Sequence, residues 1–345
     1  MDMYSTAAIA EVIRTIQRPK RFLFDLFFRN QVESDQEEIA FDIEIQKRRV
    51  TPFVAAHVPG KLVEDLGYEA KTFKPAYVKD KRAPNPKRAF KRSIGEQIGG
   101  APNLTAGQRE AALLQATLLD QQDMYYRRLE LMAFDALDDG ITTVTGEGYA
   151  TKTVDYQRPN GNTVALTGTD EWGDSGISPL DNVTAWGETF LLNSGVPVTD
   201  IVFDSKALGL FRADPAFEKA VDTTLRGSNA AIDFAAMPDF GGQLVGVLNS
   251  TTRLWLYANY YTDDNGATQK VMPDYTVLMG NNSPDGAQTR CYGAIQDPEA
   301  GYVVAESFTK SKVEFDPGAR VLLMQGAPLP VLSRPGATFR ARVKA

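Results

Sequence analysis

The side chains best suited to catalysis are scarce in this sequence, and the two that stand out are isolated. His57 is the one histidine and lies between apolar residues close to Pro59, while Cys291 is the one cysteine. A hydrolytic triad holds its histidine between a nucleophile and a carboxylate, and no motif around His57 indicates that arrangement. A packed or partly exposed histidine is therefore favoured. Cys291 precedes Tyr292 in a strand-like run, which is typical of a small buried apolar residue.

Two acidic clusters are the other candidates for chemistry. The first is TDEWGDSG, with Asp170, Glu171 and Asp174, and the second is TDDNGAT, with Asp263, Asp264 and Asn265. Paired carboxylates serve hydrolases only when the fold sets their separation, which sequence spacing does not show. The second cluster contains Asn-Gly between strand-like runs and lacks the alternating ligands and closing glutamate of a calcium loop. It predicts a hairpin turn.

Motifs for cofactors are missing as well. The sequence contains neither GxxxxGK[ST] nor GxGxxG, so a nucleotide-binding loop is not indicated. One histidine and one cysteine exclude multi-histidine and cysteine-based metal sites. We therefore expect no catalytic residue, no cofactor site and no metal site, and a chain that is not an enzyme. A hydrolase built on the carboxylates of 170–174 stays open as an alternative.

The strongest charge feature is the segment 71–93, KTFKPAYVKDKRAPNPKRAFKRS. It holds nine Lys or Arg residues and one acidic residue, so its formal charge is +8 in a chain of −7, which leaves −15 on the rest. Its candidate contact residues are Lys71, Lys74, Tyr77, Lys79, Lys81, Arg82, Lys87, Arg88, Lys91 and Arg92. Pro75, Pro84 and Pro86 exclude a long helix, so the segment is expected to be extended.

Three interpretations of this basic segment are open. It is a solvated surface loop, a nucleic-acid patch or a clamp between protein subunits. Phe73, Tyr77 and Phe90 interleave with the cations, as in sites where bases stack. However, no nucleic-acid-binding motif accompanies them, and the prolines exclude a helix that reads a DNA groove. An extended basic arm and an acidic body are complementary, so identical copies are expected to attract one another.

Composition bounds the class of protein. The 345 residues are 43% hydrophobic and 23% charged, enough for one large core or two ordinary ones. A pI near 5.0 argues against a protein that coats nucleic acid. A single cysteine excludes an internal disulfide framework. The start of the sequence lacks a signal-peptide pattern, and no apolar run approaches the ~18–20 residues that cross a membrane. We expect a soluble intracellular protein.

Two segments near the start of the chain are predicted to project from the body. In 1–30, a short helix over 6–17 precedes a cluster of aromatic residues, Phe22, Phe24, Phe27 and Phe28. So many aromatic side chains need a surface to bury against, on this chain or on another. In 37–57, a half-buried strand is predicted by the alternation of Ile39, Phe41, Ile43 and Ile45. Its predicted partner strand is 53–58, and 37–93 together is expected to form a long hairpin-like loop.

A long helix is predicted over 105–139. Thr105 is a suitable N-cap, Gln108 completes a capping-box pattern, and Gly140 supplies the stop. Apolar side chains recur on one face at helical spacing, namely Leu114, Leu118, Tyr125, Leu129, Met132 and Ala136. The helix would be roughly 50 Å long at 1.5 Å per residue, and a helix of this length is expected to run through a domain as its spine.

The rest of the chain mixes short helices with strands. Helices are predicted from 179–181 to 193 and around 214–225, and a buried strand over 201–203 leads into a helix capped by Asp204 or Ser205. Strands are predicted over 242–248, 254–261 and 270–280, with a turn at 263–266, and further strands from 292 onwards. The predicted class is α+β, with two interleaved domains and two projecting arms.

Colinear motifs resemble a known family. They are MDMYSTAAI (1–9), FLFDLFFR (22–29), FKPAYVKDKRAPNP (73–86), NSGV (193–196), IVFDSKALGLF (201–211), LRGSN (225–229), YGAIQD (292–297) and MQGAPLPVL (324–332). In this order, and with the predicted arms and spine helix, they resemble the major capsid protein family of lambda-type tailed phages. That family has the capsid fold shared by tailed phages and herpesviruses. The match is loosest at 141–180.

The resemblance implies a role for each part of the chain. Residues 1–30 would be an N-terminal arm that contacts a neighbouring subunit through Phe22, Phe24, Phe27 and Phe28, and 37–97 would be an extended loop lying across an adjacent subunit. A peripheral domain would comprise 98–180, with the spine helix, and 291–345. An axial domain would comprise 181–290, with a loop that contains Arg226, Ser228 and Asn229.

The resemblance also implies a function. The chain would form hexamers and pentamers that assemble, in the host cytoplasm, into an icosahedral procapsid, with scaffolding, portal and decoration proteins as partners. The shell would then expand and enclose double-stranded DNA, without sequence-specific binding and without a membrane. Covalent crosslinking between subunits is not predicted. The alternative is a soluble nucleic-acid-binding protein that uses 71–93.

Overall fold

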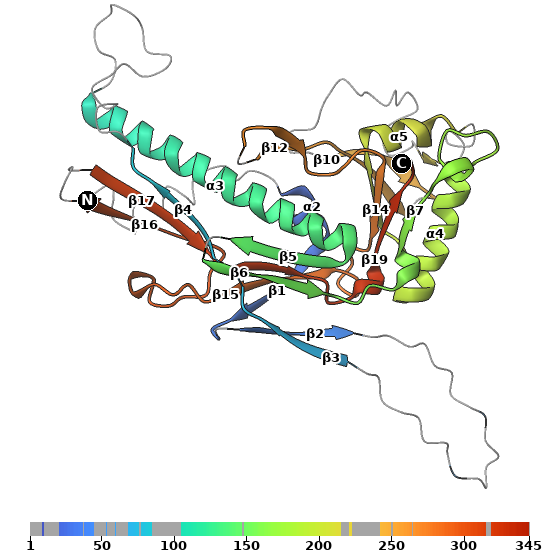
Figure 1. The fold of residues 1–345 in the computed structure, drawn as a ribbon, viewed down its shortest axis with the longest axis horizontal. Helices are drawn as coiled ribbons and strands as arrows, with labels where there is room; N and C mark the ends of the chain where they lie inside the picture. Colours follow the sequence, from blue (N-terminus) through green and yellow to red (C-terminus); the bar gives the residue numbers. More distant parts are fainter. Residues whose placement is uncertain are drawn as a thin grey trace, which may run out of the picture.

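The computed structural model describes residues 9, 21–36, 38–44, 53, 59, 68–75, 77–84, 105–146, 148–214, 221–222, 242–249, 251–263, 265–314 and 319–344. These residues form an elongated α+β body (Figure 1). A long helix runs along it from one end towards a sheet and two helices at the other end. No helix in the described part of the chain is long and apolar enough to cross a membrane.

The long helix, α3 (Ala106–Asp139), confirms the predicted spine helix. Thr105 is the N-cap, and its side chain and that of Gln108 complete the capping box; Gly140 ends the helix in the left-handed conformation with φ 69°. The side chains of Leu114, Leu118, Tyr125, Leu129 and Ala136 are buried, as the periodicity predicted. The stripe is continuous because residues three and four apart share one face of a helix.

The N-terminal residues enter the body beside α3. Helix α2 (Phe22–Phe27) leads directly into β1 (Phe28–Ser34). β1 pairs in parallel with β15 (Gln288–Gly293), which pairs antiparallel with β18 (Pro328–Val331). Residues from the start of the chain and from its last third therefore build one three-stranded sheet.

A second three-stranded sheet lies along the N-terminal half of α3, at the left in Figure 1. Its order is β16 (Phe308–Glu314), β17 (Ala319–Gly326) and β4 (Val78–Arg82), all antiparallel. Leu322 of β17 packs with Leu114 and Leu118 of α3 in a small core of its own. The sheet thus buries one face on the helix.

A seven-stranded mixed sheet forms the opposite end of the body. Its order is β7 (Thr163–Ala165), β19 (Thr338–Arg342), β14 (Thr276–Gly280), β8 (Asp200–Asp204), β11 (Thr252–Tyr257), β10 (Gly242–Leu248) and β9 (Val221–Asp222). Helices α4 (Pro179–Ser194) and α5 (Ser205–Arg212) pack on one face through Trp186, Phe190 and Phe211. Val202, Leu278 and Tyr257 of the same sheet face the other core, which includes α2 and α3.

Three hairpins and four short 3₁₀ helices complete the described chain. The hairpins pair β2 (Ile39–Glu44) with β3 (Tyr68–Phe73), β5 (Ile141–Gly146) with β6 (Tyr149–Asp155), and β12 (Tyr260–Thr262) with β13 (Thr268–Lys270). The 3₁₀ helices are η2 (Asn160–Asn162), η3 (Gly168–Asp170), η5 (Pro298–Ala300) and η6 (Pro335–Ala337). The turn predicted at 263–266 is confirmed, because Asp263 accepts from the backbone amides of Asn265 and Ala267.

Two predictions about the fold were wrong. The strand with Ile39 pairs with 68–73 and not with 53–58. Residues 221–222, predicted to be helical, form a short strand beside β10. β7 and β19 lie outside 181–290 yet complete the seven-stranded sheet, and Phe339 and Ala341 of β19 pack in the core under α4. The division into peripheral and axial domains stays a prediction. The helix predicted over 6–17 and His57 fall outside the described residues, apart from Ile9.

Candidate inter-subunit surfaces

Part of the basic segment belongs to the body and does not project. Strand β4 pairs along its length with β17, from Val78 opposite Gly326 to Arg82 opposite Leu322. The expectation of one long projecting loop over 37–97 is therefore wrong for 77–84. The prolines keep this stretch extended, as predicted, but extended backbone also suits a strand, and the free edge of β17 supplies the partner.

Arg82 is neutralised inside its own chain. Its Nε donates to Oδ2 of Asp80 at 2.8 Å, and its guanidinium also contacts Asp120 of α3. Partial burial would lower the pKa of Arg82, but Asp120 and Asp80 outweigh it, and the pKa stands above the ordinary value. Asp80 and Asp120 offset the positive charge of the guanidinium, so Arg82 attracts acidic groups of another subunit only weakly. Arg82 is thus held by its own chain, and its contact with another subunit stays a prediction.

The base of the extended loop is fastened to the body by hydrogen bonds. Lys71 Nζ donates to the backbone oxygen of Asp155 at 2.7 Å, and the Tyr149 hydroxyl donates to the backbone oxygen of Lys74. The Tyr77 hydroxyl donates to the backbone oxygen of Ala294 at 2.6 Å. These three residues of the predicted contact set thus position the loop on its own subunit.

Lys79 and Lys81 differ from their neighbours because they point outward. They alternate along β4 with Val78, Asp80 and Arg82, and both are exposed. Lys79 Nζ lies 5.0 Å from the centroid of the Tyr77 ring. Lys87, Arg88, Lys91 and Arg92 of the predicted set, and the loop residues Arg226, Ser228 and Asn229, lie outside the described residues.

The aromatic cluster of the N-terminal segment is buried within this chain. The side chains of Phe24, Phe27 and Phe28 are 0–1% exposed, and Phe22 packs edge-on against Trp255 and stacks on Tyr257. Side chains enclosed in this way present no surface to a neighbour. Of the two possibilities, burial on this chain describes Phe24, Phe27 and Phe28, and Phe22 is half-buried. A contact of the N-terminal segment with a neighbouring subunit stays a prediction.

Glu130 anchors this segment and was missed from the sequence. Its carboxylate accepts hydrogen bonds from the backbone amides of Leu23 at 2.9 Å and Phe24 at 3.2 Å. It also accepts from the Tyr257 hydroxyl at 2.8 Å. Complete burial raises the pKa of Glu130 to about 7, although the three donors oppose the rise. A signal was present, since Glu130 falls one turn after Tyr126 on the buried face of α3.

Arg21 is a second anchor for the same segment. Its guanidinium is almost buried, pairs with Glu306, and lies over the rings of Phe24 at 5.0 Å and Tyr126 at 4.5 Å. Burial alone would lower the pKa of Arg21, but Glu306 and Asp25 raise it above the ordinary value. Residues 21–28 are therefore held by charge as well as by apolar packing.

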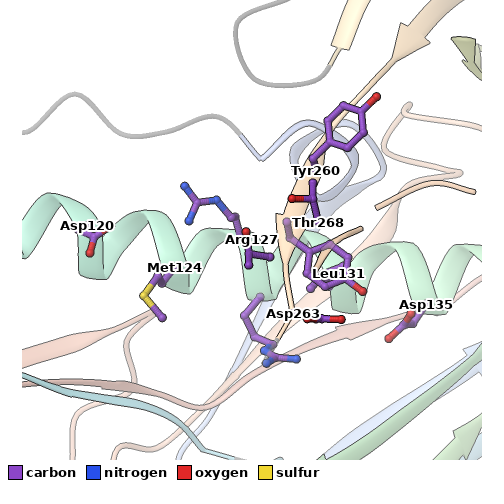
Figure 2. Close-up of a pocket in the computed structure, with 11 residues that line it drawn as sticks. Asp120, Met124, Arg127, Leu131, Asp135, Tyr260, Asp263 and Thr268 are labelled. Carbon is purple, nitrogen blue, oxygen red and sulfur yellow. The ribbon is translucent and has the colours of Figure 1, made fainter. Parts of the chain in front are cut away.

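An open groove of about 710 Å³ lies between α3 and the β12–β13 hairpin. Figure 2 shows Asp120, Met124 and Arg127 on the helix, with Tyr260 and Thr268 on the hairpin. Its lining mixes acids, cations and apolar atoms without a nucleophile beside a base. Within the described ranges, no group of three or more His, Cys, Asp or Glu side chains is placed to hold a metal ion. Cys291 is buried, and burial raises the pKa of its thiol to about 12, so it packs as an inert apolar residue.

The comparisons with known proteins agree with this geometry. The family model described as phage major capsid protein E matches residues 5–343. The chain is 28% identical to the major capsid protein of Escherichia phage lambda, with 97% of each chain covered, and 29% identical to that of Enterobacteria phage phi80, with 98% of each covered.

Solved structures show the same fold. The putative capsid protein of an E. coli CFT073 prophage superposes with a TM-score of 0.75 at 19% identity, covering 99% of each chain. A capsid protein of Ralstonia phage GP4 superposes with a TM-score of 0.54 at 10% identity, over 94% of this chain and 91% of that one. The expectations of a capsid fold and of a structural protein that is not an enzyme are confirmed by these matches. This chain belongs to the phage major capsid protein E family.

Proposed function

We propose that this major capsid protein associates as hexamers and pentamers into an icosahedral procapsid, which expands as it encloses packaged double-stranded DNA. The observation that carries the proposal is the family match over residues 5–343, which spans nearly the whole chain. Scaffolding, portal and decoration proteins are its proposed partners, the host cytoplasm its proposed site of assembly, and the virion its final location.

The parts of the molecule take specific roles in this proposal. The loop whose base is β2–β3 extends over an adjacent subunit, held in direction by the hydrogen bonds of Lys71, Lys74 and Tyr77. The seven-stranded sheet with α4 and α5 forms the axial unit, and α3 with the two three-stranded sheets forms the peripheral unit. The acid balance of the body suits a container, because DNA is held at each phosphate by a basic wall and slides past an acidic one.

The soluble nucleic-acid-binding alternative is less well supported. Of the nine cations of 71–93, Arg82 is neutralised by Asp80 and Asp120, and Lys71 is bound to the backbone of Asp155. A phosphate-binding patch needs cations that release counterions when DNA arrives, and these two side chains are already engaged.

Electron microscopy and sedimentation velocity of the purified protein test the proposal. We expect rings of five or six copies, or closed shells of uniform diameter. Replacing Lys87, Arg88, Lys91 and Arg92 by Glu is expected to abolish these particles and leave a folded monomer, whereas exchanging Lys for Arg and Arg for Lys at the same positions retains them. A wild-type chain that stays monomeric at all concentrations contradicts the proposal.

A further inference from the structure

Phe53 is a large apolar side chain that its own subunit leaves uncovered. It lies in the part of the extended loop that joins the end of β2 at Glu44 to the start of β3 at Tyr68, and it is fully exposed. The sequence around it, residues 50–60, contains no Asp, Glu, Lys or Arg. An uncharged stretch with an exposed phenylalanine is unfavourable in water, so it needs an apolar surface to cover it.

The groove between α3 and the β12–β13 hairpin offers such a surface. Of its lining residues, Leu131 and Tyr261 are half-buried and pack against the main core. Met124 on the helix and Tyr260 on the hairpin are 49% and 51% exposed (Figure 2). Methionine adapts its shape to its neighbours, and its sulfur makes favourable contacts with aromatic rings. A groove that combines a thioether with tyrosine rings is therefore suited to a phenyl ring.

The charges of the two surfaces are also complementary. Cations flank the uncharged stretch on both sides in the sequence, namely Lys47, Arg48, Arg49 and Lys61. Three carboxylates line the groove, those of Asp120, Asp135 and Asp263. Within the subunit, Asp120 is paired with Arg82, and Arg127 of the groove is paired with Asp123. Asp135 and Asp263 are thus the acids expected to attract the cations that flank Phe53.

The base of the loop and the groove lie on opposite long sides of the body. In Figure 1 the β2–β3 hairpin lies below β5 and β6, whereas β12 lies above α3. With the seven-stranded sheet at the axis of a ring, as proposed above, neighbouring copies meet along their long sides. The loop side of one copy then faces the groove side of the next, and a contact of this heterologous kind closes into a ring. Phe53 is nine positions after Glu44, so it can lie up to about 30 Å from the hairpin.

We propose that Phe53 of one copy inserts into the groove between α3 and the β12–β13 hairpin of the next copy. The inference rests on the proposed function and adds which residue anchors the extended loop and which surface receives it. The phenyl ring packs against Met124 and Tyr260, and the flanking cations lie beside Asp135 and Asp263. An aromatic side chain in a pocket often carries much of the binding energy of an interface, and this contact recurs in every copy of the assembly.

Single introduced cysteines test this contact directly, because the native Cys291 is buried. One variant carries Phe53→Cys, a second carries Tyr260→Cys, and a control carries Leu192→Cys on α4, where the side chain is 81% exposed. A disulfide requires Cα atoms about 4.4–6.8 Å apart. After two variants are mixed in equal amounts, assembled and mildly oxidised, we expect a reducible dimer from Phe53→Cys with Tyr260→Cys. We expect none from Phe53→Cys with Leu192→Cys, and none from any variant alone.

The assembly of single substitutions gives an independent measurement. Phe53→Asp and Tyr260→Asp are each expected to raise the protein concentration needed for half-assembly about tenfold. Both side chains are exposed in the subunit, so urea unfolding of the monomer should change little. Tyr260→Phe keeps the ring and is expected to assemble as the wild type does. If Phe53→Asp and Tyr260→Asp also assemble as the wild type does, the contact is refuted.

The outcomes separate the contact from the shell function. Particles that form without the dimer of Phe53→Cys and Tyr260→Cys refute the contact and leave the shell function standing, whereas a wild type that never assembles refutes both. A dimer of Phe53→Cys with Leu192→Cys instead assigns Phe53 to α4 and refutes the groove. In a chain that carries both Phe53→Cys and Tyr260→Cys, a disulfide within one monomer would show that the loop covers its own groove, which also refutes docking between copies.

Discussion

Glu130 of the spine helix accepts a hydrogen bond from the hydroxyl of Tyr257 on β11, with 2.8 Å between Oε1 and the hydroxyl oxygen. The same carboxylate holds the backbone amides of Leu23 and Phe24 at the start of α2. One buried side chain therefore joins the N-terminal segment, the long helix and the seven-stranded sheet. Because these elements belong to different parts of the fold, Glu130 couples their relative positions.

The stability of the subunit is expected to depend on the protonation of Glu130. Burial raises its pKa in the folded chain to about 7 from an ordinary value of 4.5, so the native state binds a proton more tightly than the unfolded one. The contribution is complete below pH 4.5 and is lost as the pH rises through 7. At about 1.4 kcal/mol per pH unit, the change totals about 3 kcal/mol.

Urea unfolding of monomeric protein between pH 4.5 and 8 measures this change. The wild-type free energy of unfolding, minus that of Glu130→Gln, is expected to fall across this range, because glutamine retains hydrogen-bonding groups but does not titrate. A difference that stays constant with pH would show that Glu130 titrates normally in the folded chain.

Gly326 is expected to tolerate no side chain. A Cβ at this position would lie 2.5 Å from the backbone oxygen of Glu306 and 2.6 Å from the Tyr125 hydroxyl, which itself donates to Glu306. The backbone at Glu306 cannot shift without disturbing the hydrogen bonds and packing around it. Gly326→Ala should therefore lower the free energy of unfolding by about 2–4 kcal/mol. Gly107→Ala is the control, since nothing lies within 4 Å of its Cβ, and alanine in α3 should be neutral or stabilising by about 0.5 kcal/mol. Equal melting temperatures for the two variants would contradict the clash.

Local signals in the sequence predicted local structure well. The bounds of α3 follow from the Thr105 capping box and from Gly140, which act within a few residues and do not depend on the rest of the fold. The hairpin turn at 263–266 likewise follows from Asp263 and the Gly266 that takes φ 81°. Such features need no knowledge of distant partners, and the structure confirms them.

Features that depend on distant partners were not predictable in the same way. Alternation in 39–43 shows that a strand has a buried face, but it does not name 68–73 as the partner. A cluster of phenylalanines shows that a surface is needed, but the Trp255 and Tyr257 rings of β11, on which Phe22 packs, are brought to it only by the fold. The pairing of β4 with β17, and of β17 with β16, similarly joins segments that are far apart in sequence, and no periodicity in the sequence indicates it.

Arg340 and Arg342 should differ sharply in their contributions to stability. Arg340 Nε and Nη2 bind the two carboxylate oxygens of Asp138 at 2.7 and 3.2 Å, and both side chains are almost buried. Removing one partner of a buried ion pair leaves the charge of the other without its main compensation. Arg340→Ala should therefore lower the free energy of unfolding by about 3–5 kcal/mol. Arg342 approaches Asp138 at 3.5 Å but is 44% exposed, and Arg342→Ala should cost about 1 kcal/mol or less. Denaturant titration ranks the two variants, and a larger loss for Arg342→Ala would contradict the assignment.

Tyr77 should affect assembly more than it affects the stability of the subunit. Its hydroxyl donates to the backbone oxygen of Ala294 and accepts from the amide of Gln296 at 3.2 Å, which fixes the point where the extended loop rejoins the body. Tyr77→Phe removes only these bonds, so the free energy of unfolding should fall by about 1 kcal/mol. The loop, however, loses the anchor that directs it to the neighbouring subunit, and the yield of particles should fall several-fold. Tyr260→Phe is the control, because that ring is 51% exposed at the rim of the groove. A loss of particles no greater than the loss of folded protein would show that the Tyr77 hydroxyl serves the subunit fold alone.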